Sequence, residues 1–542
     1  MKYLNTKFSV KITFFMILTF LLVGCNDYFS LQEEPKDQLS EVTFWNNKND
    51  ATRALTACYR AENWTGWWNN FNGRTIVGIQ FEGWTDILSN KELGAGFPQN
   101  GITSTNSQVR DMWSSNYVFI ARANYFLENI DKVKMDETEK ASMIAEAKFL
   151  RAYSYFWLSQ LYGNVPLIEK TMTFDEANNI SQSLKEEVVN FALKDLTDAA
   201  QSLPLKRPSS EEGRVEKGAA LALMGRFLMA EKKWAEAAQT YKQIIDLNRY
   251  VIDPRFKELF EDGGDNSDEI IFARKYMQDV FGEPFTQQAA VPGWYGGYSQ
   301  FSFMQNFVDK FLMSDGKTIQ ESPLYDPKNP FKNRDPRLYA TVLLPGYSVV
   351  NGKLYQGNPD STKQTGPGLT GYGLNKFYDH NYKGSTWSYG GDYKLIRYVE
   401  VLLGYLESNL EAGNSITQSL LNETINKVRG RASINMAPVT ETDPNKLREI
   451  IRDERAVELA CEGGIRYLDL IRWNIAAGVL NRKFYGMKVT DNPAGYNGRF
   501  IINDTGNIYI QERTFKDFNY LWPIPQSELD INKNLKQNPG YN

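Results

Sequence analysis

Residues 215–248 have the sequence VEKGAALALMGRFLMAEKKWAEAAQTYKQIIDLN. Apolar residues recur in this segment at helical spacing, so it predicts two helices joined by a turn. Gly225 and Ala237 are small at the positions where the two helices would cross closely, and Tyr241 would fill the space beyond them. The segment therefore predicts a closely packed helical hairpin.

This hairpin resembles a tetratricopeptide unit, in which neighbouring helix pairs stack on one another. Other segments also carry apolar residues at helical spacing, although only residues 215–248 show the hairpin clearly. Gly163 and Pro166 are expected to end one of these helices. The further predicted helices cover residues 44–59, 113–133, 139–162, 184–203, 395–411, 415–431 and 445–461.

Helical and irregular blocks alternate along the chain. Helical blocks at residues 107–253 and 394–475 alternate with blocks rich in Gly, Pro, Asn and aromatic residues at 62–106 and 254–393. We expect residues 39–542 to form a single, mostly α-helical domain with a tetratricopeptide-like scaffold. Loop-rich stretches of this length are usually functional, so we expect the ligand to bind there.

The N-terminus has the pattern of an export signal. Lys2, Lys7 and Lys11 precede an uncharged apolar run at residues 12–23, which is shorter than the roughly 20 residues needed to span a bilayer. Cys25 follows Leu-Val-Gly, the pattern of a bacterial lipoprotein that is cleaved before an acylated cysteine. We expect a signal peptide at 1–24 and a lipidated tether at 25–38 that anchors the chain to a membrane. The alternative is an ordinary cleaved signal followed by a chance cysteine.

Composition excludes several classes of function. Cleavage after residue 24 would remove three lysines and no acid, which changes the formal net charge from −4 to −7. The chain has no long basic run, and nucleic-acid binding requires clustered Lys and Arg. The single histidine, His380, excludes a multi-histidine metal site, and we predict no metal or cofactor. Cys58 and Cys461 lie far apart in helical patterns, which favours buried free thiols over a disulfide.

Four groups of residues are spread in order over nearly the whole chain after the signal. They are EAKFLRAY (146–153) with YGNVPL (162–167), FLMSDGK (311–317) with NRDPR (333–337), ERAVEL (454–459) with EGGIRYLDLIRW (462–473), and YLWPIP (520–525) with NPGY (538–541). Together they resemble the SusD/RagB family of nutrient-binding outer-membrane lipoproteins of Bacteroidetes. Two features depart from the family pattern. The spacing from Glu462 to Arg466 is one residue longer, and Gly404 and Leu406 stand where alanines are common.

The resemblance implies a mostly helical fold with tetratricopeptide-like hairpins on one side and a loop-rich, variable ligand-binding face on the other. It also implies that the chain captures a nutrient, mainly a glycan, and acts as a lid on a SusC-like TonB-dependent transporter without breaking any bond. The location it implies is the cell outer membrane, with palmitate or a similar lipid on Cys25 and the protein facing the cell exterior.

Charged residues near the third motif could suggest an acid–base site. They are Glu454, Arg455, Glu458, Arg466, Asp469 and Arg472. Glu454 and Glu458 are i,i+4 neighbours on a predicted helix, and the planar fork of Arg455 can bond to carboxylates. Structural ion-pair networks are common, so we predict that these residues, and also Arg151, hold helices together and perform no catalysis.

Two further motifs lack the context of the sites that they imitate. GPGLTG at 366–371 matches a dinucleotide-binding pattern, but no apolar strand precedes it and no helix follows it. DGGDNSDE at 262–269 is rich in oxygen ligands but lacks the spacing of a calcium loop, which favours a turn over a bound ion.

The tryptophans fall into two groups. Trp113, Trp157, Trp234, Trp473 and Trp522 lie in helical or motif segments and are predicted core residues, whereas Trp45 is ambiguous. Trp64, Trp67, Trp68, Trp84, Trp294 and Trp387 lie in loops rich in Gly and Asn. A loop ring can pack its loop onto the scaffold or stack on a ligand, and residue type alone leaves both open. We expect at least one of these rings to line a ligand site.

The predicted ligand-binding residues combine loop rings with polar side chains. A ring stacks on the C–H face of a sugar with roughly 1–3 kcal/mol, by analogy with base stacking, while amides, carboxylates and guanidinium groups bond to the hydroxyls. The candidates are Trp294, Tyr295, Tyr298, Trp387 and Tyr389, then Trp67, Trp68 and Trp84, with Asn70, Arg74 and Asp86 as polar partners.

Three classes of function remain open at this point. A surface protein that captures an oligosaccharide or polysaccharide for a partner transporter is favoured, and the same scaffold could serve a peptide or another non-glycan nutrient. A glycoside hydrolase needs two carboxylates about 5–10 Å apart, and no motif points to such a pair. A pure protein-binding scaffold is the third class, because tetratricopeptide hairpins commonly bind proteins.

Overall fold

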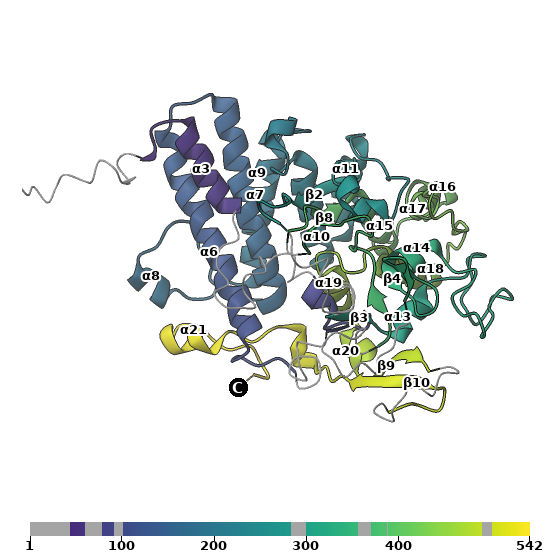
Figure 1. Ribbon diagram of the computed structural model, residues 1–542. Helices are drawn as coiled ribbons and strands as arrows, with labels where there is room; N and C mark the ends of the chain where they lie inside the picture. The colour runs from purple at the N-terminus through teal and green to yellow at the C-terminus, as the bar shows by residue number, and fades with distance from the viewer. Residues whose placement is uncertain are drawn as a thin grey trace, which may run out of the picture.

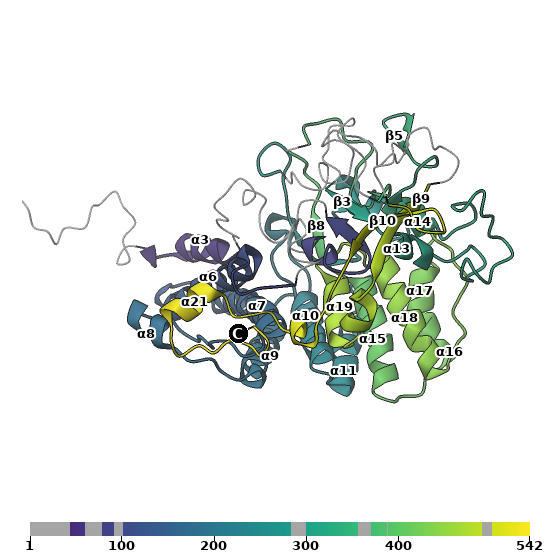
Figure 2. The ribbon, with the colours of Figure 1, turned by 90° about the horizontal axis from the view of Figure 1, so that it is seen from below.

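The structure is a computed structural model that describes residues 44–59, 79–90, 101–282, 300–355, 370–386, 388–489 and 501–541. The predicted signal peptide, Cys25 and the tether at 25–38 lie outside these residues. Helices form an array across the molecule (Figure 1). Strands β3, β8, β9 and β10 lie to one side of helices α11, α15 and α18 in the view of Figure 2. The molecule therefore has a helical side and a side made of strands and loops.

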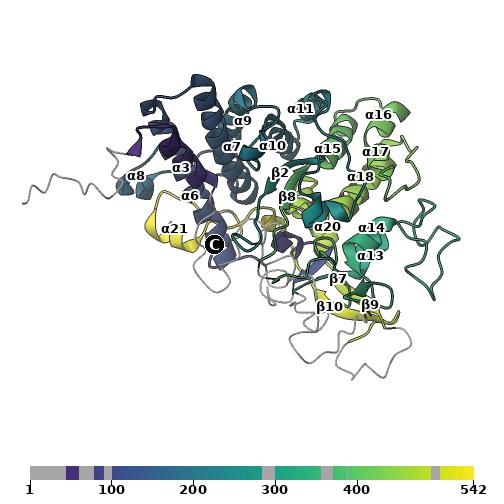
Figure 3. The same ribbon diagram turned by 45° about the horizontal axis from the view of Figure 1, so that its top comes forward.

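The scaffold is a series of helices in which neighbours pack together. Contacts join α6 to α7, α7 to α9, α10 to α11 and α11 to α15, and Figure 3 shows this row of helices. The scaffold helices are α3 (Lys48–Tyr59), α6 (Ser107–Asn129), α7 (Glu137–Tyr162), α9 (Lys185–Ser202), α10 (Lys217–Ala230), α11 (Trp234–Asp246), α15 (Tyr398–Glu411), α16 (Gln418–Glu423), α17 (Ile425–Arg429) and α18 (Pro444–Glu458). They confirm the mostly α-helical, tetratricopeptide-like architecture, with shifted ends and with the segment 415–431 divided into two short helices. Among the described helices, none is both long and apolar enough to cross a bilayer.

Helix α7 shows how local sequence sets the ends of an element. The Asp136 side chain accepts a hydrogen bond from the backbone N–H of Glu139 at 3.0 Å and so caps the N-terminus. Gly163, with φ of 75°, ends the helix in a backbone conformation that favours glycine. The helix therefore stops where the sequence predicts it.

Tyr241 fills a space between three helices. A Cβ atom at Gly225 on α10 would lie 2.5 Å from Cε1 of the Tyr241 ring, and one at Gly404 on α15 would lie 2.7 Å from Cε2. Ala237 of α11 is fully buried in the same hairpin. Glycine therefore stands at position 404 because the Tyr241 ring occupies the space that an alanine methyl group would need.

Residues 395–397 differ from the predicted helix at 395–411. Strand β8 (Tyr393–Arg397) pairs antiparallel with strand β2 (Ile270–Arg274), and α15 begins only at Tyr398. The backbone N–H of Tyr398 donates to the carbonyl oxygen of Glu269 at 2.8 Å, at the end of this strand pair. The apolar spacing of this segment fits a helix, but a partner strand that is distant in sequence determines its conformation.

A four-stranded sheet joins the two loop-rich blocks. Its order is β1–β3–β7–β4. Strand β1 pairs antiparallel with β3, and Asn90 lies opposite Phe301. The strands are β1 (Leu88–Asn90), β3 (Phe301–Phe303), β4 (Val342–Leu343) and β7 (Gly373–Leu374). The block at 62–106 therefore contributes a strand to a sheet otherwise built from the block at 254–393.

Short elements complete the strand-rich side and the far end of the scaffold. They are α8 (Phe174–Asn179), α13 (Gln305–Lys310), α14 (Pro336–Thr341), β5 (Val349–Val350), β6 (Lys353–Leu354), α19 (Ile465–Arg472), α20 (Ala476–Leu480), β9 (Lys483–Lys488), β10 (Asn507–Glu512) and α21 (Gln526–Ile531).

Aromatic residues from distant parts of the chain share one core. The fully buried ring of Trp522 lies 5.6 Å from that of Phe81, which stacks on Trp157 at 5.0 Å. The backbone N–H of Trp522 donates to the carbonyl oxygen of Leu161 at 2.6 Å. Of the tryptophans assigned from sequence, Trp113, Trp157 and Trp522 are buried, as is Trp45, whereas Trp234 and Trp473 are half-buried. Cys58 and Cys461 are buried free thiols, as predicted.

The charged residues of the third motif form a buried ion-pair network, as predicted. Glu458 accepts hydrogen bonds at 3.0 Å from both Arg337 and Arg431. Arg455 is paired with Asp469 at 2.8 Å. The two oxygens of Asp195 likewise accept from the guanidinium of Arg151, at 2.8 and 2.9 Å. These pairs join segments that are distant in sequence and thereby hold the scaffold together.

Candidate ligand-binding face

Two segments of the loop-rich block at 254–393 meet beside strand β2. The chain turns back at residues 277–281, where the backbone groups of Met277 and Phe281 hydrogen-bond to each other at 2.8 and 2.9 Å. The backbone N–H of Asp279 donates to the Ser388 hydroxyl at 2.8 Å, and that hydroxyl donates to the Asp279 carboxylate at 2.6 Å. A side chain at Gly282 would collide with the backbone of Ser388. Gly282, which precedes residues 283–299, therefore lies next to Ser388, which follows Trp387.

The residues that follow 283–299 contact the loop-rich block at 62–106. Phe301 lies opposite Asn90 in the β1–β3 pair, and the backbone N–H of Met304 donates to the carbonyl oxygen of Ile87 at 2.9 Å. The Asn306 side chain also donates to the carbonyl oxygen of Asp86 at 2.7 Å. Contacts at both ends of residues 283–299 thus join distant segments of the loop-rich blocks. We call the region formed by these flanking contacts the loop face.

Most of the predicted ligand-binding residues lie outside the described residues. These are Trp294, Tyr295, Tyr298, Trp387, Trp67, Trp68, Asn70 and Arg74, and Trp64 lies there too. Their assignment to the ligand site stays a prediction. Trp84, Asp86 and Tyr389 are described, and the structure places each of them in the interior.

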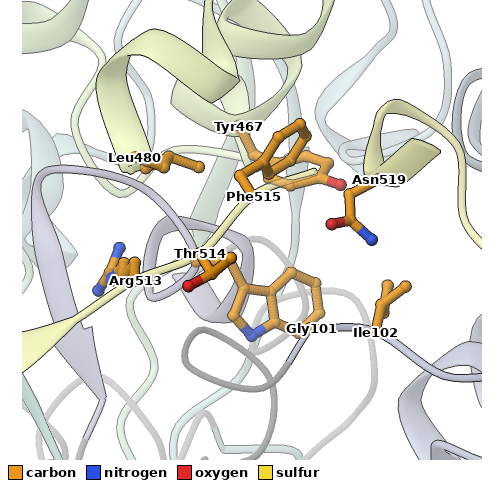
Figure 4. Close-up of a pocket in the computed structure, with 9 residues that line it drawn as sticks. Gly101, Ile102, Tyr467, Leu480, Arg513, Thr514, Phe515 and Asn519 are labelled. Atoms are coloured by element: carbon orange, nitrogen blue, oxygen red, sulfur yellow. The ribbon is translucent and has the colours of Figure 1, made fainter. Parts of the chain in front are cut away.

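Trp84 belongs to the aromatic core. Its side chain is 5% exposed, and its ring lies 4.8 Å from Phe81 and 5.4 Å from Trp522. Trp84 also lines a small cavity of about 40 Å³. Figure 4 shows Ile102, Phe515 and other labelled residues around this cavity. A cavity of this size holds a water molecule and has no room for a sugar ring. Trp84 therefore packs its loop onto the scaffold, which differs from the expected role in stacking on a ligand.

Asp86 forms a buried ion pair. Its two carboxylate oxygens accept hydrogen bonds from Nε and Nη2 of Arg466, both at 2.9 Å. Burial alone would raise the pKa of Asp86, but the Arg466 guanidinium outweighs that effect and holds the pKa below its usual value. Because both oxygens are engaged inside the protein, Asp86 joins the loop before β1 to α19 and does not serve as the predicted hydroxyl ligand.

Tyr389 is also buried. Its hydroxyl accepts a hydrogen bond from the backbone N–H of Asp262 at 2.9 Å and lies 3.4 Å from an oxygen of Asp379. Its ring contacts that of Tyr382 edge to face, with centroids 5.0 Å apart. Tyr389 therefore anchors the turn that follows Trp387, and its ring is unavailable for the predicted stacking.

Tyr276, Phe281 and Tyr382 were absent from the predicted set, yet their rings lie beside the loop face. Tyr276 and Phe281 stack with centroids 5.8 Å apart and an interplanar angle of 11°, and Phe281 is 47% exposed. Both lie in the aromatic-rich block at 254–393, which the sequence did indicate. Neither residue lies beside a loop tryptophan in the sequence, which is the signal that marked the predicted rings.

A mostly polar cleft borders strand β2. It has a volume of about 270 Å³, and its walls include Arg207, Arg214, Arg249, Glu212 and Asp268. These charges pair with one another or with neighbours, as in the Arg249–Asp268 pair at 2.5 Å and the Arg207–Glu146 pair at 2.7 Å. Phe272 is the one aromatic residue that lines this cleft, and it is buried, so the cleft offers little ring surface for sugar stacking.

The residues considered for ion or acid–base chemistry have structural partners. Nε2 of His380 lies 2.8 Å from the side-chain oxygen of Asn375, and burial lowers the pKa of His380 to about 4. In the predicted turn at 262–269, Asp265 pairs with Lys394 at 2.5 Å and Glu269 pairs with Arg431 at 2.7 Å. In the described ranges, no group of three or more His, Cys, Asp or Glu side chains is arranged to hold a metal ion.

Known proteins share this architecture. A family model described as the SusD family matches residues 265–541, and one described as "Starch-binding associating with outer membrane" matches residues 26–229. A crystal structure of a SusD-like carbohydrate binding protein from Bacteroides fragilis is similar with a TM-score of 0.84 and 35% identity, covering 91% of this chain and 100% of that chain. A second SusD-like protein from Bacteroides fragilis has a TM-score of 0.78 and 25% identity, over 94% of this chain and 100% of the other. SusD-like protein P25 of Formosa agariphila is 23% identical over 98% of each chain.

Proposed function

Because this chain belongs to the SusD family, we propose that it binds a glycan at the loop face and delivers it to a partner transporter. The ligand is an oligosaccharide or polysaccharide, and the partner is a SusC-like TonB-dependent transporter of the outer membrane. The starch-binding description of the N-terminal family match and the carbohydrate-binding relative at 35% identity support a sugar as ligand.

The observation that carries this proposal is the meeting of distant chain segments at the loop face. Gly282 adjoins Ser388 within the block at 254–393, and the pairing of Asn90 with Phe301 joins that block to the one at 62–106. Rigid stems of this kind can hold variable loops close to one another. The segments between these stems carry Trp294, Tyr295, Tyr298 and Trp387, which we propose as the principal stacking residues. Trp67, Trp68, Asn70 and Arg74 remain the second group.

Binding without bond cleavage fits the placement of the acidic residues. Glu454, Glu458 and Asp469 are buried and paired with arginines, so their carboxylates hold the fold and are inaccessible to a glycosidic bond. Several weak ring contacts on a surface-anchored protein are sufficient to capture a polymer, because repeated sites on one chain multiply modest affinities.

We further propose that lipid on Cys25 anchors the protein to the outer membrane with the loop face toward the exterior. The apolar run that ends at Cys25 and the outer-membrane description of the match over residues 26–229 support this location. A peptide or another non-glycan nutrient is the alternative ligand for the same role.

A glycan panel tests the proposal. Affinity electrophoresis and calorimetry of the protein with neutral and acidic polysaccharides should identify at least one ligand. In Trp294→Ala and Trp387→Ala, affinity for that ligand should fall roughly 5- to 150-fold, the equivalent of about 1–3 kcal/mol per stacked ring. Phe174→Ala is a matched control, because this ring is 86% exposed on α8 in the N-terminal half of the scaffold.

Each alternative has its own outcome in this experiment. Unchanged affinity in both tryptophan variants would place the site elsewhere, and binding of peptides in place of glycans would establish the alternative ligand. New reducing ends after incubation with a glycan would identify a hydrolase. Purification of the wild-type protein from outer membranes should also yield a TonB-dependent transporter in the same complex.

A further inference from the structure

Arg274 stands out among the charged residues beside the loop face. Its guanidinium carbon lies 5.5 Å from the ring centroid of Tyr276 and 5.8 Å from that of Phe281. The two rings are parallel and stacked, so the three side chains form one compact unit at the end of β2. We call this unit the Arg274 platform.

The guanidinium of the Arg274 platform is half-buried and has no hydrogen-bonding partner among the described residues. Its Nε is buried without an acceptor. The scaffold arginines differ, since Arg226 and Arg455, for example, each bind a carboxylate with two nitrogens. A partly buried guanidinium without an acceptor loses the hydrogen bonds that water would provide, which is unfavourable until an acceptor binds.

The carboxylates that adjoin the platform are engaged elsewhere. Asp279 accepts hydrogen bonds from the Ser388 hydroxyl at 2.6 Å and from the Gln278 amide at 3.3 Å. Asp392 accepts from the backbone N–H of Tyr276 at 2.9 Å and pairs with Lys275. Neither carboxylate forms an ion pair with the guanidinium of Arg274.

The platform also offers apolar surface to a ligand. Met277 is 61% exposed, Val280 is 78% exposed and Phe281 is 47% exposed. Hydrogen bonds between Asp279 and Ser388 fix the turn that carries these side chains, so this surface is preorganised. A ligand with an apolar face and an anionic substituent would match both parts of the platform.

We propose that the Arg274 platform binds a negatively charged sugar, in which a carboxylate or a sulfate ester pairs with Arg274 while the ring of the sugar contacts Phe281. A guanidinium binds either anion through two parallel N–H···O bonds, which are charge-assisted and directional. This inference rests on the proposed glycan binding and adds the ligand class, an acidic glycan.

Matched acidic and neutral glycans test the proposal. Binding of polygalacturonate and alginate is compared with that of their carboxyl-reduced forms, and binding of dextran sulfate is compared with that of dextran. The wild-type protein should prefer the acidic member of at least one pair, and this preference should weaken as the salt concentration rises. Loss on carboxyl reduction identifies a uronic acid, whereas loss on removal of sulfate identifies a sulfate ester.

Variants of the platform complete the experiment. Arg274→Gln should lower affinity for the acidic glycan roughly tenfold or more, while affinity for any neutral ligand is unchanged. Arg274→Lys should give an intermediate loss, because the charge remains but the planar fork is lost. Arg482→Gln is the matched control, since Arg482 also lies over a phenylalanine ring, 5.1 Å from the centroid of Phe484, and its loss should leave binding unchanged.

Equal affinity for the acidic and neutral members of every pair, or wild-type affinity for the acidic glycan in Arg274→Gln, would overturn this inference and leave glycan binding intact. The guanidinium would then only cover the rings of the turn. Absence of binding to every glycan, acidic or neutral, would instead contradict the proposed function itself.

Discussion

Gly404 lies directly against the ring of Tyr241, where a Cβ atom would come within 2.7 Å of Cε2. Gly404→Ala should therefore destabilise the protein by about 1–3 kcal/mol, because overpacking forces the ring or the helices to move. Unfolding by urea, followed by circular dichroism, measures this loss.

Gly478→Ala is the control for this prediction. Gly478 lies within α20, and no atom comes within 4 Å of the Cβ position there. The extra methyl group should leave stability unchanged or raise it by up to about 1 kcal/mol, since alanine favours a helix over glycine. Equal stability of Gly404→Ala and the wild type would show that the three helices tolerate a wider spacing.

Acid should weaken the scaffold through Glu458. Burial alone would raise the pKa of this carboxyl group, but Arg431, Arg397 and Arg337 outweigh burial and lower the pKa to about 2. The folded pKa is thus below the ordinary value of 4.5, so the contribution of Glu458 to stability is complete above about pH 4.5 and is lost as the pH falls toward 2.

Glu458→Gln should be less stable than the wild type at pH 7 by about 3–5 kcal/mol, because arginines remain buried without their carboxylate. Between pH 4.5 and 3 the stability of this variant should fall less than that of the wild type. Glu449→Gln serves as the control, since Glu449 forms only an exposed pair with Arg452. Parallel pH profiles for the wild type and Glu458→Gln would contradict the assigned pKa shift.

Asp86 provides a test that separates stability from binding. Asp86→Asn should lower stability by about 3–5 kcal/mol, because it leaves the buried guanidinium of Arg466 without its carboxylate. Glycan affinity of the folded fraction should stay at the wild-type value. Wild-type stability combined with a loss of glycan affinity would contradict this structural role and show that Asp86 takes part in ligand binding.

The proposed lipid attachment at Cys25 predicts a change of cell fraction when this residue is replaced. In Cys25→Ala the protein should leave the membrane fraction and should no longer incorporate labelled palmitate, because the acylated thiol is absent. Cys58→Ala should keep the label and the membrane location, since Cys58 is buried in α3. Membrane retention of Cys25→Ala would point to a different anchor.

The sequence predicted the helices well because their determinants are local. Asp136 and Gly163 set the ends of α7 through contacts within a few residues. The error at residues 395–397 has the opposite cause, since β8 depends on pairing with β2, which is distant in sequence. Apolar periodicity describes one segment at a time and carries no information about such a partner.

The same reasoning explains the outcome for the candidate site. Trp84, Asp86 and Tyr389 lie in loop-rich sequence, but their partners Trp522, Arg466 and Asp262 come from elsewhere in the chain. Burial of a loop residue is decided by such partners, whereas the sequence shows only the residue type. The position of the loop face itself was predictable, because long irregular blocks rich in aromatic residues mark it.

Trp522 also restricts how the chain can acquire its structure. Its indole completes a core that contains Phe81 and Trp157, so this core cannot finish packing until Trp522 has been synthesised. Separate expression of the two regions matched by the family models should yield two incompletely folded polypeptides, although each model describes a continuous stretch of sequence.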